Sequence, residues 1–269
     1  MLNKKTCMKL LFSILSLYFL VSNANAQQMK WNKNVVIAHR GAWKKNNFPE
    51  NSIASLKEAI RLKCYGSEFD VHFTKDSVIV VNHDDVFKGL TIATSTYAEL
   101  QQHLHTNGEQ IPTLENFLKE GMKQRSTKLI LEIKMALTPE STIALTDAVV
   151  KLVKRLKADV WVEYISFSYP AVQRIIQLDP AAKTAFLASL KGEVQLEQLK
   201  KDHIGQADYH YSVYKTGDWF TQAHKLGITI NAWTVNKEED MKWLLSNQAD
   251  FITTNEPELL FEILNTEKC

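Results

Sequence analysis

Short apolar runs rich in β-branched residues alternate with amphipathic stretches along most of this chain. The amphipathic stretches carry apolar residues at helical spacing and predict helices near 52–62, 114–123, 141–156, 171–178, 219–226 and 238–245. The apolar runs predict strands near 35–38, 67–71, 129–133, 163–167, 184–188, 207–211, 229–233 and 251–253. Strands that alternate with helices are typical of a parallel sheet covered by helices, and eight strands close a barrel. The sequence therefore predicts an α/β fold, a TIM (β/α)8 barrel.

One segment interrupts this alternation after the second predicted strand. The run Val78–Val81 follows the turn-like tripeptide Lys75–Ser77 and leads to His83, which indicates a strand that folds back as a hairpin. The residues from Asp84 to Pro112 then form a small insertion, which we interpret as a lid or a specificity loop. No linker, low-complexity tract or repeat is visible, so we expect a single domain.

The amino-terminal residues have the pattern of a cleavable secretory signal. Lysines near the start precede the apolar stretch Leu10–Val21, which is too short to span a bilayer comfortably, and Ala24-Asn25-Ala26 resembles a cleavage site. We expect residues 1–26 to be a signal peptide cut after Ala26, and residues 27–269 to form the barrel domain in the periplasm or outside the cell. An uncleaved anchor is the less favoured alternative, and no stable membrane insertion is expected after cleavage.

Charge and cysteine content exclude some classes of partner. The whole chain has 32 basic and 30 acidic side chains. Removal of residues 1–26 takes away three lysines and no acid, so no basic excess remains and we expect no nucleic-acid partner. A small anionic substrate needs only a local cluster of cations. Export permits a disulfide between Cys64 and Cys269, but nothing in the sequence indicates that these residues lie close together.

Five polar clusters occur at the ends of strand-like segments. In a (β/α)8 barrel the carboxyl ends of the strands meet at one mouth, and catalytic sites of this fold lie there. We therefore expect the clusters to contribute to a single site. They are His39-Arg40-Gly41, Pro49-Glu50-Asn51, Glu68-Phe69-Asp70, His83-Asp84 and Glu132-Ile133-Lys134.

The acidic residues of these clusters predict a metal site. Glu68 and Asp70 are two residues apart and share one face of a strand, and Glu132 ends the next strand of the barrel. Three carboxylates in one cleft repel one another unless they are protonated, paired with cations or bound to a metal. An all-oxygen ligand set favours Ca²⁺ or Mg²⁺. The Glu-x-Asp spacing alone more often marks solvated acids, and the third acid and the nearby histidines favour the metal.

Two histidines follow apolar runs and are the candidates for proton transfer. Hydrolytic cleavage requires a base that activates the nucleophile and an acid that protonates the departing group, and histidine can do both near neutral pH. We predict that His39 and His83 form this catalytic pair. For the other histidines a structural role is expected, with His72 a candidate neighbour of the site.

Substrate binding is predicted for three further polar residues, Arg40, Glu50 and Lys134. The Arg40 guanidinium and the Lys134 ammonium can contact phosphate oxygens, and each can also pair with the carboxylates. Glu50 stands near the start of the first helix, where Asn51 or Ser52 is available as the N-cap, and we expect it to support the site.

Aromatic residues at strand ends are the candidates for an apolar wall. Trp233 ends the seventh predicted strand, and we assign it to the substrate pocket. For Phe167 a pocket wall and a core position are equally favoured.

The clusters, in this order, resemble the motifs of the glycerophosphodiester phosphodiesterase family. The similarity extends from Val35 to Pro257 and includes the closing Trp-Thr-Val-Asn and Thr-Asn-Glu-Pro elements. Many members of the family carry an Arg and paired Thr after His-Asp, where this chain has Val86-Phe87-Lys88-Gly89-Leu90-Thr91, so headgroup contacts are not carried over. The resemblance implies a TIM barrel with a divalent ion on Glu68, Asp70 and Glu132, an acid/base pair of His39 and His83, and phosphodiester contacts from Arg40 and Lys134.

We therefore expect metal-dependent hydrolysis of glycerophosphodiesters to an alcohol and, by resemblance, sn-glycerol 3-phosphate. One alternative is a phospholipase D-like barrel that acts on lysolipids or sphingolipids, which would require an apolar rim. Another is a non-catalytic barrel that binds phosphate compounds, which loss of a histidine or a ligand would favour, and none is lost. The sequence leaves open the headgroup, the choice between Ca²⁺ and Mg²⁺, and whether water or a substrate hydroxyl attacks.

Overall fold

The structure is a computed structural model that describes residues 29–189 and 192–266. The predicted signal peptide, its cleavage site and Cys269 lie outside these residues. Cys64, the other half of the disulfide considered above, is fully buried. No helix within the described ranges is long and apolar enough to cross a membrane.

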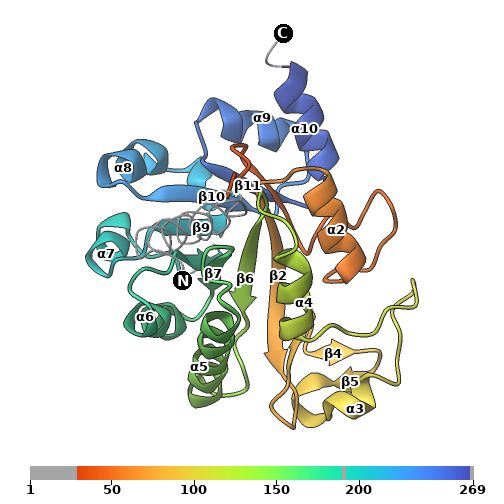
Figure 1. Cartoon of the computed structure of the whole chain (residues 1–269). Helices are drawn as coiled ribbons and strands as arrows, with labels where there is room; N and C mark the ends of the chain where they lie inside the picture. Colours follow the sequence, from red (N-terminus) through yellow and green to blue (C-terminus); the bar gives the residue numbers. More distant parts are fainter. Residues whose placement is uncertain (1–28, 190–191, 267–269) are drawn as a thin grey trace, which may run out of the picture. The chain divides into compact units, whose positions relative to one another are not determined.

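Parallel strands close into a barrel at the centre of the domain (Figure 1). Closure is direct, because β1 pairs in parallel with both β11 and β2. The predicted TIM barrel is therefore confirmed, with boundaries that differ by a residue or two from the expected ones. The barrel strands are β1 (Val36–Ala38), β2 (Gly66–Phe73), β6 (Lys128–Ile133), β7 (Val162–Ser166), β8 (Thr184–Ala188), β9 (Gln206–His210), β10 (Thr229–Trp233) and β11 (Phe251–Thr254).

Helices surround the strands (Figure 1). Several begin at a Ser or Thr whose hydroxyl accepts a hydrogen bond from a main-chain N–H three residues on, which satisfies one of the free donors of the first turn. The N-cap of the first described helix is Ser52, one of the two residues expected there. The helices are α2 (Ile53–Arg61), α4 (Leu114–Gly121), α5 (Pro139–Leu156), α6 (Tyr169–Leu178), α7 (Leu196–Lys201), α8 (Trp219–Leu226), α9 (Glu238–Ser246) and α10 (Pro257–Thr266).

The hydrophobic core has two parts, because alternate residues of each strand point to opposite faces. Side chains such as Phe69 and Leu131 face the surrounding helices and are fully buried. Ile37, Ile130 and Leu187 fill the barrel interior. The interior is therefore packed, and the polar residues that continue the same inward face lie at its carboxyl mouth.

The predicted hairpin and insertion follow β2. β3 (Ile79–Val81) pairs antiparallel with β2. The insertion then contains the two-stranded sheet β4 (Val86–Phe87) and β5 (Leu90–Thr91), the short helix η1 (Ile92–Thr94) and α3 (Tyr97–Leu100). In Figure 1 these elements lie beside the carboxyl end of β2. They enclose a small core of their own, made of Val80, Phe87, Ile92, Leu100 and Ile111.

A carboxylate anchors this insertion to the barrel. Glu109 accepts hydrogen bonds from the main-chain N–H groups of Ile53 (2.9 Å) and Ala54 (3.1 Å), at the start of α2. A carboxylate at a helix amino terminus is stabilised by the free N–H groups and the helix dipole. The separate core and this anchor favour a fixed specificity element over a hinged lid.

Candidate active site

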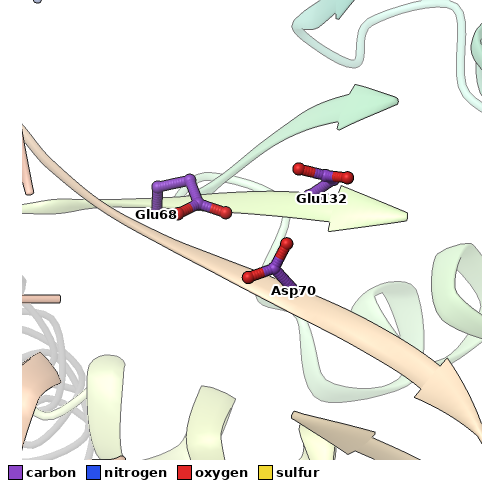
Figure 2. A group of neighbouring side chains, drawn as sticks. All are labelled: Glu68, Asp70 and Glu132. Atoms are coloured by element: carbon purple, nitrogen blue, oxygen red, sulfur yellow. The ribbon is translucent and has the colours of Figure 1, made fainter. Parts of the chain in front are cut away.

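Three carboxylates from neighbouring strands lie together at the carboxyl mouth of the barrel. β2 carries Glu68 and Asp70, β6 carries Glu132, and the parallel register places Asp70 opposite Glu132. One oxygen from each lies within 4.8 Å of the others, and the side chains converge in Figure 2. All are buried, with at most 8% of the residue exposed. The structure thus brings the predicted metal ligands together.

Crowding and burial change the protonation of this group. Burial raises the pKa of Glu68 well above its usual value, and the charges of Asp70 and Glu132 add to the rise. Burial and the charge of Asp70 raise the pKa of Glu132 to about 8. Burial acts in the same direction on Asp70, but Lys134 and other nearby donors outweigh it and lower the pKa of Asp70. Without a counter-charge, the folded protein therefore keeps protons on part of this cluster.

The donors present fit a hard divalent cation. Among the described residues, nothing donates a hydrogen bond to Glu68 Oε1 or to Asp70 Oδ1, although both atoms are buried. The Nζ atom of Lys134 lies 3.0 Å from Glu132 Oε1 and 3.4 Å from Asp70 Oδ1, which offsets only part of the negative charge. Unpartnered, buried, anionic oxygens are the ligands that Mg²⁺ and Ca²⁺ prefer.

Asn51 positions Asp70, one of the predicted metal ligands, a role that we did not predict. Its Nδ2 donates to Asp70 Oδ2 (2.9 Å), and its Oδ1 accepts from the Asp70 main-chain N–H (3.1 Å). We had expected the Pro49–Asn51 cluster to end a strand, but it lies in the loop between β1 and α2. Because Ser52 caps the helix, the Asn51 side chain is free to turn toward β2. A left-handed φ of 58°, which asparagine tolerates, allows this turn.

Arg40 links the loop between β1 and α2 to strand β2. Its main-chain N–H donates to Glu68 Oε2 (2.8 Å), and its guanidinium Nη1 donates to Glu50 Oε2 (2.6 Å). Glu50 therefore supports the site through Arg40. Next to it, Gly41 has a φ of 80°, and a Cβ there would lie 2.4 Å from Ser55 Oγ. Only glycine lets the chain pass this close to α2.

His39 follows β1 directly, and Asn255 orients its ring. The Nδ1 atom of His39 lies 2.7 Å from Asn255 Oδ1. An amide oxygen only accepts, so Nδ1 carries the proton and Nε2 keeps a free lone pair. Burial, with the nearby Arg40 charge, lowers the pKa of His39 to about 4. Asn255 was not predicted as a site residue, although it stands directly after β11.

His83 occupies a loop position. It lies two residues beyond the end of β3, so it does not end a strand as the apolar run before it suggested. Its Nδ1 lies 2.7 Å from Asp84 Oδ1, and this hydrogen bond lowers the pKa of Asp84. Its carbonyl oxygen accepts from Nε2 of His72 (3.0 Å), which fixes the loop against β2. An ionised acid thus holds a proton on the ring nitrogen Nδ1.

A cavity of about 150 Å³ unites the predicted residues. All of them line it except Asp70, which lies within the carboxylate group, and Glu50, which contacts Arg40. Phe167 and Trp233 form an apolar wall, with ring centroids 5.5 Å apart in an edge-to-face arrangement. Both are therefore pocket residues. Asp208 also lines this cavity and was not predicted.

The model of the glycerophosphoryl diester phosphodiesterase family matches residues 39–259. The chain belongs to this family. A glycerophosphodiester phosphodiesterase of Caldanaerobacter subterraneus subsp. tengcongensis is 28% identical over 251 residues, which cover 86% of this chain and 98% of the relative.

Solved structures agree with this assignment. The crystal structure of a glycerophosphodiester phosphodiesterase from Parabacteroides distasonis is 39% identical, covers 89% of this chain and 100% of its own, and has a TM-score of 0.84. A phosphodiesterase from Oleispira antarctica, determined in complex with the product sn-glycerol-3-phosphate, shares the fold at 23% identity and a TM-score of 0.73, with 86% and 97% of the two chains covered. The family membership that the sequence predicted is therefore confirmed.

Proposed function

We propose that this protein hydrolyses glycerophosphodiesters to an alcohol and sn-glycerol 3-phosphate, with a divalent cation, Ca²⁺ or Mg²⁺, held by Glu68, Asp70 and Glu132. Family membership makes the chain a phosphoric diester hydrolase. The observation that carries the metal-dependent form of the proposal is the group of buried, partly unpartnered carboxylate oxygens within 4.8 Å of one another. When bound, the cation would supply a Lewis acid for a phosphoryl oxygen.

The two histidines differ in what their hydrogen bonds can stabilise. Asn255 is neutral and leaves the Nε2 lone pair of His39 free, which suits a base that takes the proton of the attacking hydroxyl. Asp84 is anionic and accepts a hydrogen bond from Nδ1 of His83, and a carboxylate partner of this kind suits a histidine that acts as an acid and gives a proton to the departing oxygen. We assign the base to His39 and the acid to His83.

Two cations on the cavity wall would hold the phosphodiester. Arg40 and Lys134 both line the cavity and already lie against carboxylates of the site. Each can contact phosphoryl oxygens from its position, and Arg40 offers the planar fork that suits them. The Trp233 and Phe167 rings would exclude water from the opposite side.

Removal and return of the metal tests the cofactor. Metal-stripped protein should release no sn-glycerol 3-phosphate from glycerophosphocholine in a coupled dehydrogenase assay, and Mg²⁺ or Ca²⁺ should restore release. Glu68→Gln, Asp70→Asn and Glu132→Gln should abolish the metal response. Glu163→Gln, which alters an acid at the other end of the barrel, should retain it. Full activity in excess chelator would contradict the metal.

A good leaving group tests the assignment of the histidines. On glycerophosphocholine, His39→Ala and His83→Ala should each lower kcat by about 10²-fold or more. On a p-nitrophenyl phosphodiester the departing oxygen needs no proton, so His83→Ala should recover activity and His39→Ala should not. His224→Ala, an exposed control on α8, should match the wild type on both substrates. Equal losses of the two active-site variants on both substrates would refute separate roles.

A second candidate substrate class has one observation in its favour. Met135 and Leu137 lie one and three residues after Lys134, which lines the cavity, and are 62% and 83% exposed. An apolar rim of this kind suits the acyl chain of a lysolipid. The double variant Met135→Ser/Leu137→Ser should then lose hydrolysis of lysophosphatidylcholine and keep that of glycerophosphocholine. No lysolipid hydrolysis by the wild type would exclude this candidate.

We also propose that the protein is exported to the periplasm or outside the cell with residues 1–26 removed. The lysine-rich start, the short apolar stretch and the Ala24-Asn25-Ala26 step support this proposal. Cell fractionation followed by amino-terminal sequencing should find the mature protein outside the cytoplasm, starting at Gln27. A retained Met1 would contradict it.

A further inference from the structure

A buried acid lines the active-site cavity on the side opposite the metal site. Asp208 lies on β9, and in the closed order of the barrel β9 is the strand farthest from β2, which carries Glu68 and Asp70. Asp208 is 1% exposed and borders the same cavity as Glu68 and His39. It is not within the group of carboxylates that could share an ion. Asp208 therefore has no role in the mechanism proposed above.

Hydrogen bonds fix one side of this carboxylate and leave the other without a donor. Asn231 Nδ2 donates to Asp208 Oδ1 (2.7 Å) and also lies 2.8 Å from Thr253 Oγ1, whose hydroxyl donates back to Asn231 Oδ1 (3.2 Å). The indole of Trp233 donates to the Asp208 carbonyl oxygen (2.8 Å), which ties the acid to the pocket wall. No described residue donates to Asp208 Oδ2. The Asp208 side chain is thus oriented by its Oδ1 atom, and its Oδ2 atom remains available as an acceptor.

A buried acid at the other end of the barrel, Glu163, shows what a purely structural arrangement looks like. Glu163 borders a cavity of about 310 Å³ at the amino ends of the strands. Its carboxylate accepts from the Tyr65 hydroxyl (2.9 Å) and from Lys183 (3.1 Å). Both of its oxygens are engaged, because the Tyr65 hydroxyl also lies 3.1 Å from the second one. Asp208 has no such neutralising partners.

The chemistry of the cavity indicates which ligand group Asp208 serves. Phosphoryl oxygens would be repelled by an acid and are matched by Arg40 and Lys134 at the other side of the cavity. Burial raises the pKa of Asp208 to about 7, against the opposing effect of the Asn231 hydrogen bond, so near neutral pH the carboxyl group can accept or donate. A neutral hydroxyl matches a group of this kind, and the substrates proposed above carry hydroxyls.

We propose that Asp208 binds a hydroxyl group of the substrate and makes the enzyme select polyol-bearing phosphodiesters. The proposal rests on the proposed function. The hydroxyl comes from the glycerol moiety or from a polyol headgroup such as inositol. Asp208 is in this view a specificity-determining residue that anchors one end of the substrate while the metal site and the cations hold the phosphodiester.

The test compares substrates with and without hydroxyls. Asp208→Ala should lower kcat/KM for glycerophosphoinositol, and for glycerophosphocholine if the hydroxyl is that of glycerol, by about 10- to 100-fold, the loss expected for a hydrogen bond that involves an ionisable partner. Its kcat/KM for bis(p-nitrophenyl) phosphate, which has no hydroxyl, should stay within about twofold of the wild type. Glu163→Gln, the matched buried acid, should leave the ratio between substrates with and without hydroxyls unchanged. Equal losses on substrates of both kinds would overturn the proposal.

Product binding gives a readout that does not depend on turnover. The wild type should bind sn-glycerol 3-phosphate more tightly than ethyl phosphate, and Asp208→Ala should remove this difference, since a ratio within one variant is insensitive to partial misfolding. Asp208→Asn, which keeps the Asn231 contact, should show an intermediate ratio. An unchanged ratio in Asp208→Ala would exclude the glycerol hydroxyl as the partner of Asp208, and together with undiminished hydrolysis of glycerophosphoinositol it would overturn the proposal.

Two further comparisons complete the test. One distinguishes a glycerol hydroxyl from a headgroup hydroxyl, and the other distinguishes failure of this inference from failure of the proposed function. Glycerophosphocholine has hydroxyls only on glycerol, so a loss confined to glycerophosphoinositol would assign Asp208 to the headgroup, and a loss on both would assign it to glycerol. If the wild type itself releases no sn-glycerol 3-phosphate from either diester, the proposed function fails. In that case the binding ratio of the two phosphate monoesters still tests Asp208.

Discussion

Glu132→Gln should stabilise the metal-free protein while it abolishes the metal site. The folded pKa of Glu132 is about 8, against a usual value of 4.5. Between these values the folded state binds a proton that the unfolded state has released, so the free energy of unfolding falls as the pH rises. Each pKa unit corresponds to about 1.4 kcal/mol, so the wild type loses about 3 kcal/mol by pH 7. Glutamine mimics the protonated acid and avoids this loss.

Urea unfolding in excess chelator measures the effect. At pH 4.5 the variant and the wild type should have similar free energies of unfolding, and at pH 7 the variant should be more stable by about 3 kcal/mol. The attraction between Glu132 and Lys134 is already contained in the raised pKa, so no separate correction is needed.

Metal should reverse the order of stability. At a cation concentration about 100 times its Kd, the wild type should gain about 2.7 kcal/mol, because the ion binds only the folded state. Glu132→Gln should gain little. Parallel stability curves of the two proteins across pH 4.5 to 8 in chelator would refute the account of the carboxylate cluster. A full metal-induced gain in the variant would refute the role of Glu132 as a ligand.

Two further predictions concern the loops around the site. Gly41→Ala should lower the free energy of unfolding by about 2–4 kcal/mol and impair activity, because Gly41 has a left-handed φ and passes close to Ser55. The control Gly89→Ala, with a φ of 85° and nothing within 4 Å of its Cβ, should lower it by only about 1–2 kcal/mol, and equal losses in thermal unfolding would contradict this reasoning. Asn51→Ala should lower stability by about 2–4 kcal/mol and weaken the affinity for Mg²⁺, measured by calorimetry, because it removes both hydrogen bonds to Asp70; an unchanged metal affinity would show that Asp70 does not need this support.

The sequence predicted those parts of the site that follow from local periodicity. Alternating strand and helix patterns predict the barrel because each element buries one face. The spacing of Glu68 and Asp70 places both on one face of β2, and the adjacent strand brings Glu132 beside them. Carboxyl ends of parallel strands meet at one mouth, so the convergence needed no information on long-range contacts.

Residues that act through contacts distant in sequence were missed for the same reason. The bond between His39 and Asn255 joins residues 216 positions apart, and no local pattern marks it. Asn51 and Ser52 were the two possible N-caps of the first helix, and only the choice of Ser52 leaves the Asn51 side chain free to turn toward Asp70. Asp208 looks like an ordinary polar residue in a strand until its burial is known.

The insertion was the least predictable part of the fold. Its strands β4 and β5 have two residues each, which is too short for an alternating pattern to be recognised. His83 belongs to the same region, and its loop position depends on where the hairpin ends. Periodicity could therefore identify the segment as an insertion but could not describe its structure.

Glu109 couples two parts of the protein that a protein engineer would treat as separate modules. The insertion looks exchangeable, yet its carboxylate completes the first turn of α2, and the residues just before that turn hold Asp70. A chimaera that receives a foreign insertion without an equivalent acceptor would leave two amide donors of α2 unsatisfied and loosen the segment that orients Asp70, a proposed metal ligand. Such a chimaera should bind the proposed cation more weakly, whatever substrate preference the new insertion brings. A carboxylate restored at the position of Glu109 should be the first correction.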